Sequence, residues 1–326
     1  MAIIINHLRG LPSWLLLLSI LGLFSLVSNL LVPLLKWLYA AFLRPRKDLA
    51  RSYGSWAVVT GATDGIGLAV AFQLACGGGL HLLLVGRNPA KLRQVAADIA
   101  AACGGGGGGG SLVKMRTVVI DLAGDAAEGR RRLERAIEGL DVGVLVNNAG
   151  TTHPSAAYAH EMPEEAWQRI VKVNVEATTW VAHTVIRRMV EKGRGAVVNI
   201  GSASGTALPS FPFHAIYSAT KAYVDQLSKS LNIPFYVATK MISAKGSSSL
   251  LIPSPDQFAA AAVRWIGYES ICAPYWPHTV QWFFASLFPD FVLNAWRLHV
   301  GIRKRNESIA LLDVPKAAFL CMRNFI

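Results

Sequence analysis

The chain has 326 residues, of which 52% are hydrophobic and only 16% are charged, and its formal net charge is +12. A chain of this length can hold one large core, or one domain with appendages. Its basic residues cluster at positions 44–51 and 303–305, beside apolar segments, and no nucleic-acid-binding motif accompanies them. We therefore expect an anionic membrane face as their partner and exclude nucleic acid.

The four cysteines, Cys76, Cys103, Cys272 and Cys321, include no pair at the spacing of metal ligands, and the histidines form no such pair either. The sequence therefore predicts no metal site and no disulfide framework. A reduced catalytic domain that faces the cytosol is the simplest interpretation.

The first 50 residues read as a membrane anchor followed by a basic linker. Between Arg9 and Lys36 there are 26 residues without a charge, more than the about 20 that a helix needs to cross a bilayer. A cleaved signal peptide is the alternative, but the apolar run is too long and no small-residue cleavage site follows it. Because positive charges are more numerous after the run than before it, we expect the rest of the chain in the cytosol.

Residues 51–250 alternate short apolar strands with segments of helical length. Strands are predicted at 56–60, 80–85, 118–122, 142–147 and 196–200, and helices at 68–76, 89–103 and 164–192. The glycine run at 104–110 predicts a surface loop. This alternation predicts an α/β fold with a doubly wound parallel sheet of the Rossmann type.

Residues 251–326 form an apolar, aromatic C-terminal segment with a basic tail. Tyr275–Trp296 is crowded with Trp and Phe, but Pro277, Pro289 and Asp290 interrupt it. A second membrane span and a helix lying in the membrane interface both stay open, and the interruptions favour the second.

A glycine-rich turn joins the first predicted strand to the first helix. Its residues, Thr60 to Gly67, read T-G-A-T-D-G-I-G. Glycines at such a turn let the backbone approach a pyrophosphate at the helix N-terminus, where amide groups and the helix dipole favour an anion.

Three further motifs follow in order, and together they carry a resemblance. They are Asn147–Gly150 (N-N-A-G), Asn174 between two valines, and Tyr217–Lys221 (Y-x-x-x-K). With the T-G-x-x-x-G-x-G turn, they resemble the short-chain dehydrogenase/reductase family from about Gly54 to Lys221. The resemblance implies a nicotinamide cofactor, reduction of a carbonyl group, and catalytic roles for Tyr217, Lys221, Asn174 and a serine.

The spacing of Tyr217 and Lys221 has a chemical reason. Residues four apart share one face of a helix, so the lysine ammonium can lie near the phenol. A neighbouring cation favours the phenolate and lowers the pKa of a tyrosine, which helps it to exchange a proton with a carbonyl oxygen. For the serine, alignment to the strand end favours Ser202, whereas Ser204 has the more usual distance from the tyrosine; both stay open.

Arg87 follows the second strand, where an arginine suits the 2′-phosphate of NADPH and an acidic residue would suit NAD. We therefore predict NADPH. The family resemblance implies these cofactor-binding residues: Gly61, Thr63, Asp64, Gly65, Ile66, Gly67, Arg87, Asp121, Asn148, Ala149, Gly150, Tyr217, Lys221, Val237 and Thr239.

Several phrases outside the motifs are similar to one subgroup, the very-long-chain 3-oxoacyl-CoA reductases of the fatty acid elongase. They are Tyr53–Ala57, Ile137–Gly143, Tyr236–Met241 and Cys272–His278. This similarity implies reduction of a long-chain 3-oxoacyl-CoA to the 3-hydroxyacyl-CoA, elongase subunits as partners, and the endoplasmic reticulum membrane as location. A hydroxysteroid-type ketone reductase, or an impaired variant that acts as a non-enzymatic elongase partner, are the alternatives.

One departure from the subgroup's pattern concerns the region 222–236, which is shorter than in the relatives. A helix from Lys221 to Leu231 descends about 15 Å, and Asn232–Val237 could climb back at most about 20 Å. We therefore expect the sixth strand to be truncated, or the helix to unwind early. Either outcome would weaken the placement of Val237 and Thr239.

Overall fold

The structure is a computed structural model that describes residues 12–104, 113–153, 155–206, 210–231, 236–241, 253–268 and 271–311. It divides into two compact units, residues 1–45 and 46–326, which are described separately. Most of the predicted glycine loop at 104–110 and the basic tail after 311 lie outside the described residues.

The first unit is one continuous apolar helix, Ser13–Leu43, whose side chains are not buried. It consists of α2 (Ser13–Leu26), the π-helical turn η1 (Val27–Leu31), α3 (Val32–Leu38) and a second π-helical turn η2 (Tyr39–Leu43). Pro33 lacks the amide hydrogen that a regular helix would use there, and the first π turn directly precedes it. With 31 residues, the helix is long and apolar enough to cross a membrane, as predicted.

The second unit is built on a parallel sheet of seven strands. Its spatial order is β3-β2-β1-β4-β5-β6-β7, and every pair is parallel, which confirms the predicted doubly wound fold. Strands β1, β4 and β5 are buried along their whole length, as a sheet covered on both faces requires. The strands are β1 (Trp56–Thr60), β2 (His81–Gly86), β3 (Met115–Val119), β4 (Val142–Asn147), β5 (Ala196–Ser202), β6 (Tyr236–Met241) and β7 (Ile271–Cys272).

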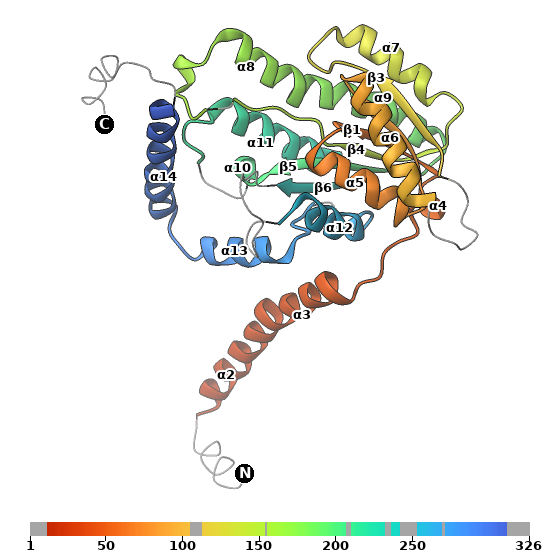
Figure 1. The fold of residues 1–326 in the computed structure, drawn as a ribbon. Helices are drawn as coiled ribbons and strands as arrows, with labels where there is room; N and C mark the ends of the chain where they lie inside the picture. The colour runs from red at the N-terminus through yellow and green to blue at the C-terminus, as the bar shows by residue number, and fades with distance from the viewer. Residues whose placement is uncertain are drawn as a thin grey trace. The chain divides into compact units, whose positions relative to one another are not determined.

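Helices cover both faces of this sheet (Figure 1). Side chains of α7 and α9, among them Leu133 and Trp180, pack with Leu145 of β4 in one apolar cluster. Helix α12, with its buried Phe258, packs on α5. The helices are α4 (Leu49–Ser52), α5 (Gly65–Cys76), α6 (Pro89–Gly104), α7 (Ala126–Ile137), the 3-10 turn η3 (Ala159–Glu161), α8 (Glu164–Val171), the π-helical turn η4 (Lys172–Ala177), α9 (Thr178–Glu191), α10 (Ala203–Thr206), α11 (Ala215–Ser230) and α12 (Pro255–Trp265).

The third strand is displaced from its predicted position. It was expected at 118–122, the most apolar stretch, and it lies at Met115–Val119, where it pairs with Leu82–Gly86. The stretch Ile120–Leu122 instead follows the carboxyl end of β3 and contributes to a cleft described below. Pairing with β2 therefore decides the bounds of β3, rather than hydrophobicity.

The expected truncation near 222–236 is wrong for both elements. Helix α11 continues to Ser230, and β6 has six residues that pair with Val197–Ser202 of β5. The expectation assumed that the chain reaches the carboxyl edge of the sheet, where the cofactor would bind, by Val237. In the structure Tyr236 only begins the strand, so the climb takes place over Tyr236–Met241, and the short connection suffices.

The aromatic C-terminal segment forms two helices and not one. Helix α13 (Trp276–Ser286) ends before Pro289, and α14 (Asp290–Leu311) begins directly after it. Within the described ranges, Ser13–Leu43 is the one helix long and apolar enough to cross a membrane. The two shorter helices agree with the interpretation that Tyr275–Trp296 is not a span.

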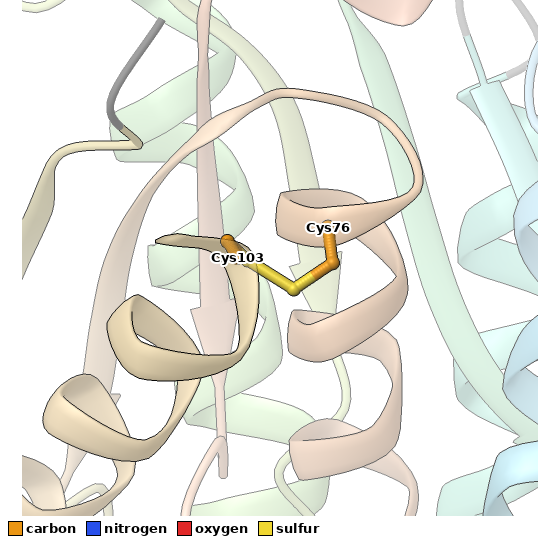
Figure 2. The surroundings of a disulfide bond; sticks show 2 residues. All are labelled: Cys76 and Cys103. Carbon is orange, nitrogen blue, oxygen red and sulfur yellow. A yellow bond between two sulfur atoms is a disulfide. The ribbon is translucent and has the colours of Figure 1, made fainter. Parts of the chain in front are cut away.

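A disulfide joins Cys76 and Cys103, and it corrects the prediction that the cysteines form none (Figure 2). The two residues are 27 positions apart, but their Cα atoms are only 4.9 Å apart. The reason is tertiary: α5 and α6 pack against each other, and each cysteine lies in the last turn of its helix. Spacing along the chain carries no sign of this contact.

Candidate active site

The turn between β1 and α5 can be formed only with glycines. Gly61 and Gly65 have φ angles of +63° and +54°, which favour glycine. A Cβ at Gly67 would lie 2.3 Å from both Asn148 Nδ2 and Gly61 O. Asp64 caps the helix, since its carboxylate accepts a hydrogen bond from Gly65 N.

The N-N-A-G motif at the end of β4 holds this turn in place. Asn148 Nδ2 donates to Thr60 O at 3.0 Å and to Gly61 O at 3.1 Å. The hydroxyl of Thr60 accepts from the backbone N–H groups of Asn148 and Ala149. Two motifs that lie almost ninety residues apart therefore form one rigid edge.

A cleft of about 420 Å³ opens at this edge, over the carboxyl ends of β1 to β4. The strand order reverses between β1 and β4, and such a switch point is where doubly wound sheets bind ligands. Nine of the predicted cofactor-binding residues line the cleft: Gly61, Thr63, Asp64, Ile66, Arg87, Asp121, Asn148, Ala149 and Gly150.

The cleft also contains residues that the motifs did not indicate. Arg169, on α8, adds a second cation to Arg87, and Thr151 and Val173 line the cleft as well. Arg169 belongs to a helix whose position against the strand ends depends on tertiary packing. The sequence signal was only a basic residue on a predicted helix, which many surface residues share.

Tyr217 and Lys221 lie one turn apart on α11, as predicted. The Lys221 ammonium is 5.9 Å from the centre of the Tyr217 ring and donates to Ile200 O at 2.9 Å. The expected lowering of the Tyr217 pKa is wrong: burial raises it above its usual value, and the hydrogen bond with Ser202 offsets only part of that rise. Burial also lowers the pKa of Lys221 to about 8.

The two candidate serines lie together and are both buried. Their hydroxyl oxygens are 2.9 Å apart, and Ser204 N donates to Ser202 Oγ. Ser202 ends β5 and shares the hydrogen bond with Tyr217. The geometry therefore assigns the position beside the phenol to Ser202. Ser204 contacts the hydroxyl of Ser202.

Asn174 lies in the π-helical turn η4 and is fully hydrogen-bonded. Its amide nitrogen donates to Thr151 O and Thr220 Oγ1, and its oxygen accepts from Thr151 N. Gly150 faces both Asn174 and Lys221, since a Cβ there would lie 3.5 Å from Asn174 Oδ1 and 3.4 Å from Lys221 Nζ. The structure thus gathers the four predicted catalytic residues around the ends of β4 and β5.

Val237 and Thr239 lie inside β6, and their contact with the cofactor stays a prediction. They pair with Val198 and Ile200 inside β6, and the residue level with Ser202 is Met241. A cofactor-contacting loop would follow the strand, so these two residues stand before it. The register of the sheet, and not the motif, decides this placement.

Comparisons with known proteins agree with this geometry. The family model of short chain dehydrogenases matches residues 55–242. A very-long-chain 3-oxoacyl-CoA reductase-like protein of Arabidopsis thaliana is 43% identical, covering 88% of this chain and 94% of its own. A very-long-chain 3-oxoacyl-CoA reductase of Coprinopsis cinerea is 35% identical, covering 92% and 93%. The human inactive hydroxysteroid dehydrogenase-like protein 1 is 36% identical, covering 81% and 82%.

Solved structures are similar as well. A short-chain dehydrogenase from Sphingobium yanoikuyae in complex with NADPH is 28% identical, with a TM-score of 0.56 over 80% of this chain and 97% of its own. A 7β-hydroxysteroid dehydrogenase has a TM-score of 0.65 over 77% and 99%, and at 21% identity it shows the fold alone.

Proposed function

Because the chain belongs to the short-chain dehydrogenase/reductase family of oxidoreductases, we propose that it reduces the 3-keto group of a long-chain 3-oxoacyl-CoA with NADPH. The observation that carries the proposal is the buried contact of Tyr217 with Ser202, one turn from Lys221. The substrate class is supported by the names of its plant and fungal relatives. Elongation of very long acyl chains is the process that such a reaction serves.

The residues of the cleft fit a dinucleotide with a 2′-phosphate. The glycine turn presents the N-terminus of α5 to the cleft, and no atom would contact a Cβ at Gly65, so the approach is open. Arg87 at the end of β2 supplies the positive charge that a 2′-phosphate needs, and Arg169 supplies a second. Asp121 lies after β3, at the far side of the same cleft.

When bound, NADPH supplies a hydride to the carbonyl carbon of the substrate. Tyr217 donates its proton to the carbonyl oxygen, and its raised pKa keeps that proton on the phenol until it is needed. Ser202 donates a hydrogen bond to the same oxygen and stabilises the negative charge that develops there. Ser204 orients Ser202 through the contact between their hydroxyls.

Lys221 and Asn174 support the proton donor. The Lys221 ammonium favours the phenolate that forms after the transfer, and Ile200 O fixes the direction of the lysine chain. Asn174 holds the backbone of Thr151 at the lip of the cleft through two hydrogen bonds. These residues position the reacting groups and keep water away from them.

The proposal includes a location. The helix Ser13–Leu43 would anchor the chain in the endoplasmic reticulum membrane, with the second unit facing the cytosol and elongase subunits as partners. The excess of basic residues after the helix supports this orientation. The disulfide argues against it, because disulfides are rare in the cytosol.

A second candidate function is a non-enzymatic partner of the elongase. Two observations favour it: the relatives include proteins named inactive hydroxysteroid dehydrogenase-like protein 1, and Val237 and Thr239 stand inside β6. The intact set of Tyr217, Ser202 and Lys221 favours the enzyme.

The test is oxidation of NADPH by the detergent-solubilised full chain with a long-chain 3-oxoacyl-CoA. Tyr217→Phe should lower kcat by roughly 100- to 10,000-fold. Tyr223→Phe is the matched control, since Tyr223 lies on the same helix and its hydroxyl contacts Thr179 instead. It should leave the rate nearly unchanged.

Three other outcomes would redirect the proposal. Turnover of a steroid ketone without turnover of the acyl-CoA would identify a hydroxysteroid-type reductase. Binding of NADPH without any turnover would identify the partner role. Turnover with NADH and not NADPH would contradict the role given to Arg87.

A further inference from the structure

Helix α14 faces the rest of its unit with polar residues. Asn294 Oδ1 accepts a hydrogen bond from Ser210 Oγ at 2.7 Å, and Arg297 lies over the ring of Phe211. One turn later Gly301 lets the helix approach closely, since a Cβ there would lie 2.7 Å from the Phe213 ring. The positions 294, 297, 301 and 305 therefore form the inner face of the helix.

The last of these positions carries a buried arginine, which pairs with a more exposed carboxylate. The Arg305 guanidinium donates to both carboxylate oxygens of Glu161 at 2.7 Å, and it stacks on the rings of Tyr158 and Phe213. Arg305 is only 7% exposed. A bidentate pair with a buried guanidinium restricts the rotation of α14 about its own axis.

The exposed side chains in the first half of the same helix are apolar. Phe291 is 73% exposed and Trp296 is 58% exposed, and Leu298 and Ile302 are also exposed. A helix on the surface of a water-soluble protein has the opposite arrangement, with apolar residues inward and polar residues outward. In the first half of α14 this arrangement is therefore inverted, as in proteins whose outer surface meets lipid, whereas His299, Arg303 and Asn306 make the exposed side polar further along.

Helix α13 leads through a corner into α14 (Figure 1), and large apolar side chains at this corner are exposed. Between Glu269 and Asp290 the chain has no charged residue. The exposed corner consists of Trp282, Phe283, Phe284, Leu287 and Phe288.

We propose that this corner, together with the exposed apolar side chains in the first half of α14, inserts into one leaflet of a lipid bilayer and lies in its interface. Helix α13 has 11 residues and is about 17 Å long, whereas the hydrocarbon core is about 30 Å thick. The corner is therefore too short to span the membrane, and the exposed tryptophans suit the interface.

Lipid fits this surface better than a second copy of the chain does. The chain already carries the helix Ser13–Leu43, which needs a bilayer of its own, so lipid is always present. This inference uses exposure and polarity only, and it stands whether or not the proposed reaction is correct.

The consequence concerns access to the site. The inner face of α14 is seated on residues 210–213, which lead into α11 and Tyr217, and on the segment 156–161, which follows β4. Insertion of the corner therefore holds the rim of the active site against the membrane. A substrate dissolved in the bilayer could enter without crossing water.

The test places a fluorescent probe on single cysteines of the full chain, reconstituted in vesicles of phosphatidylcholine and phosphatidylserine. All four native cysteines, Cys76, Cys103, Cys272 and Cys321, are replaced by serine, and the probe (the environment-sensitive NBD group) is attached at Phe283→Cys or Phe288→Cys. Val190→Cys on α9 is the control, because Val190 is as exposed as these residues but lies outside the patch. The Ser13–Leu43 helix keeps every variant on the vesicles.

Lipids with a nitroxide near the head group should quench the probe at 283 and 288 by roughly twofold or more, and aqueous iodide should not. At position 190, iodide should quench the probe and the nitroxide lipids should not. Equal iodide quenching at all three positions would overturn the proposal. So would shielding from iodide without quenching by lipid, which would indicate a protein partner or a second copy, and so would strongest quenching at the bilayer centre, which would indicate a span.

Discussion

Burial affects the two ionisable residues of the catalytic helix in opposite directions. It raises the pKa of Tyr217 and lowers that of Lys221, because in each case it disfavours the charged form. The phenol therefore stays protonated, as a proton donor requires. Lys221, in contrast, is buried where its charged form is disfavoured. Burying this charge destabilises the folded state, and we attribute its retention to function.

Replacing this lysine by methionine should stabilise the fold while abolishing turnover. In the unfolded chain the lysine has its usual pKa of 10.5, and in the folded chain about 8. Below pH 8 the full cost of burying the charge is present, and it disappears as the pH rises from about 8 to 10.5. At pH 7 we expect Lys221→Met to be more stable by roughly 1–3 kcal/mol, measured by thermal unfolding without cofactor.

Lys172 is exposed, so Lys172→Met is the control. It should change neither the stability of the fold nor the turnover. The gain of Lys221→Met over the wild type should shrink between pH 8 and 10. A loss of stability at pH 7 would contradict the account of a costly buried charge.

The two serines differ in what their hydroxyls contact. Ser202→Ala should lower kcat by roughly 100-fold or more, because it removes the hydrogen bond to the carbonyl oxygen. Ser204→Ala should cost about tenfold, because it only frees the orientation of Ser202. Steady-state kinetics of both variants, with unfolding temperatures as a check on folding, measure this difference. A larger effect of Ser204→Ala would reverse the assignment.

At the scale of elements, the ion pair of Arg305 with Glu161 is one of the contacts that set the rotation of α14. The hydrogen bonds from Arg305 hold the pKa of Glu161 below its usual 4.5, and they outweigh the effect of its burial. The stabilising contribution of the pair is therefore present above pH 4.5 and is lost as the pH falls through the lowered pKa. We expect α14 to stay seated at neutral pH.

Arg305→Met should release the helix at neutral pH. Hydrogen exchange over residues 290–303 should become faster by roughly tenfold or more, since a charged pair with two hydrogen bonds is removed. His299→Met, on the exposed side of the same helix, should leave the exchange unchanged. Equal protection in both variants would show that the apolar contacts of Phe213 with Gly301 suffice.

The disulfide links α5, whose N-terminus borders the cleft, to the neighbouring helix α6. It closes a loop between residues that are 27 positions apart, which should stabilise the chain by about 3.5 kcal/mol. Cys76→Ser with Cys103→Ser should therefore lower the unfolding temperature, and a reductant should do the same to the wild type. The reductant should have no further effect on the double variant; an additional loss would show that it acts elsewhere.

The sequence predicted those parts of the molecule whose chemistry requires fixed spacing. The turn from Gly61 to Gly67 and the pair Tyr217 and Lys221 were found because glycine conformation and helical periodicity leave a local pattern. The bounds of β3 and the contact of Cys76 with Cys103 were missed. Each of these depends on pairing or packing between distant segments, which no local pattern records.

At the scale of the whole molecule, two features favour different cellular compartments for the second unit. The basic residues after the first helix favour the cytosol for the second unit, whereas the disulfide suits an oxidising compartment. We expect the charge rule to prevail, so that both thiols are reduced in living cells. Alkylation of thiols at the moment of lysis, followed by mass spectrometry, measures this; a disulfide already present would place the unit in the lumen.

The inverted polarity of the first half of α14 has a consequence for handling the protein. Deleting the first 45 residues would remove the long apolar helix but leave the corner and the apolar side chains of α14 exposed. Such a truncated chain should still aggregate in buffer without detergent. Deleting α14 would not solve this, because its inner face covers the residues around Phe213. A form suited to crystallisation therefore calls for polar replacements at Phe284, Phe288 and Phe291, with the helix itself retained.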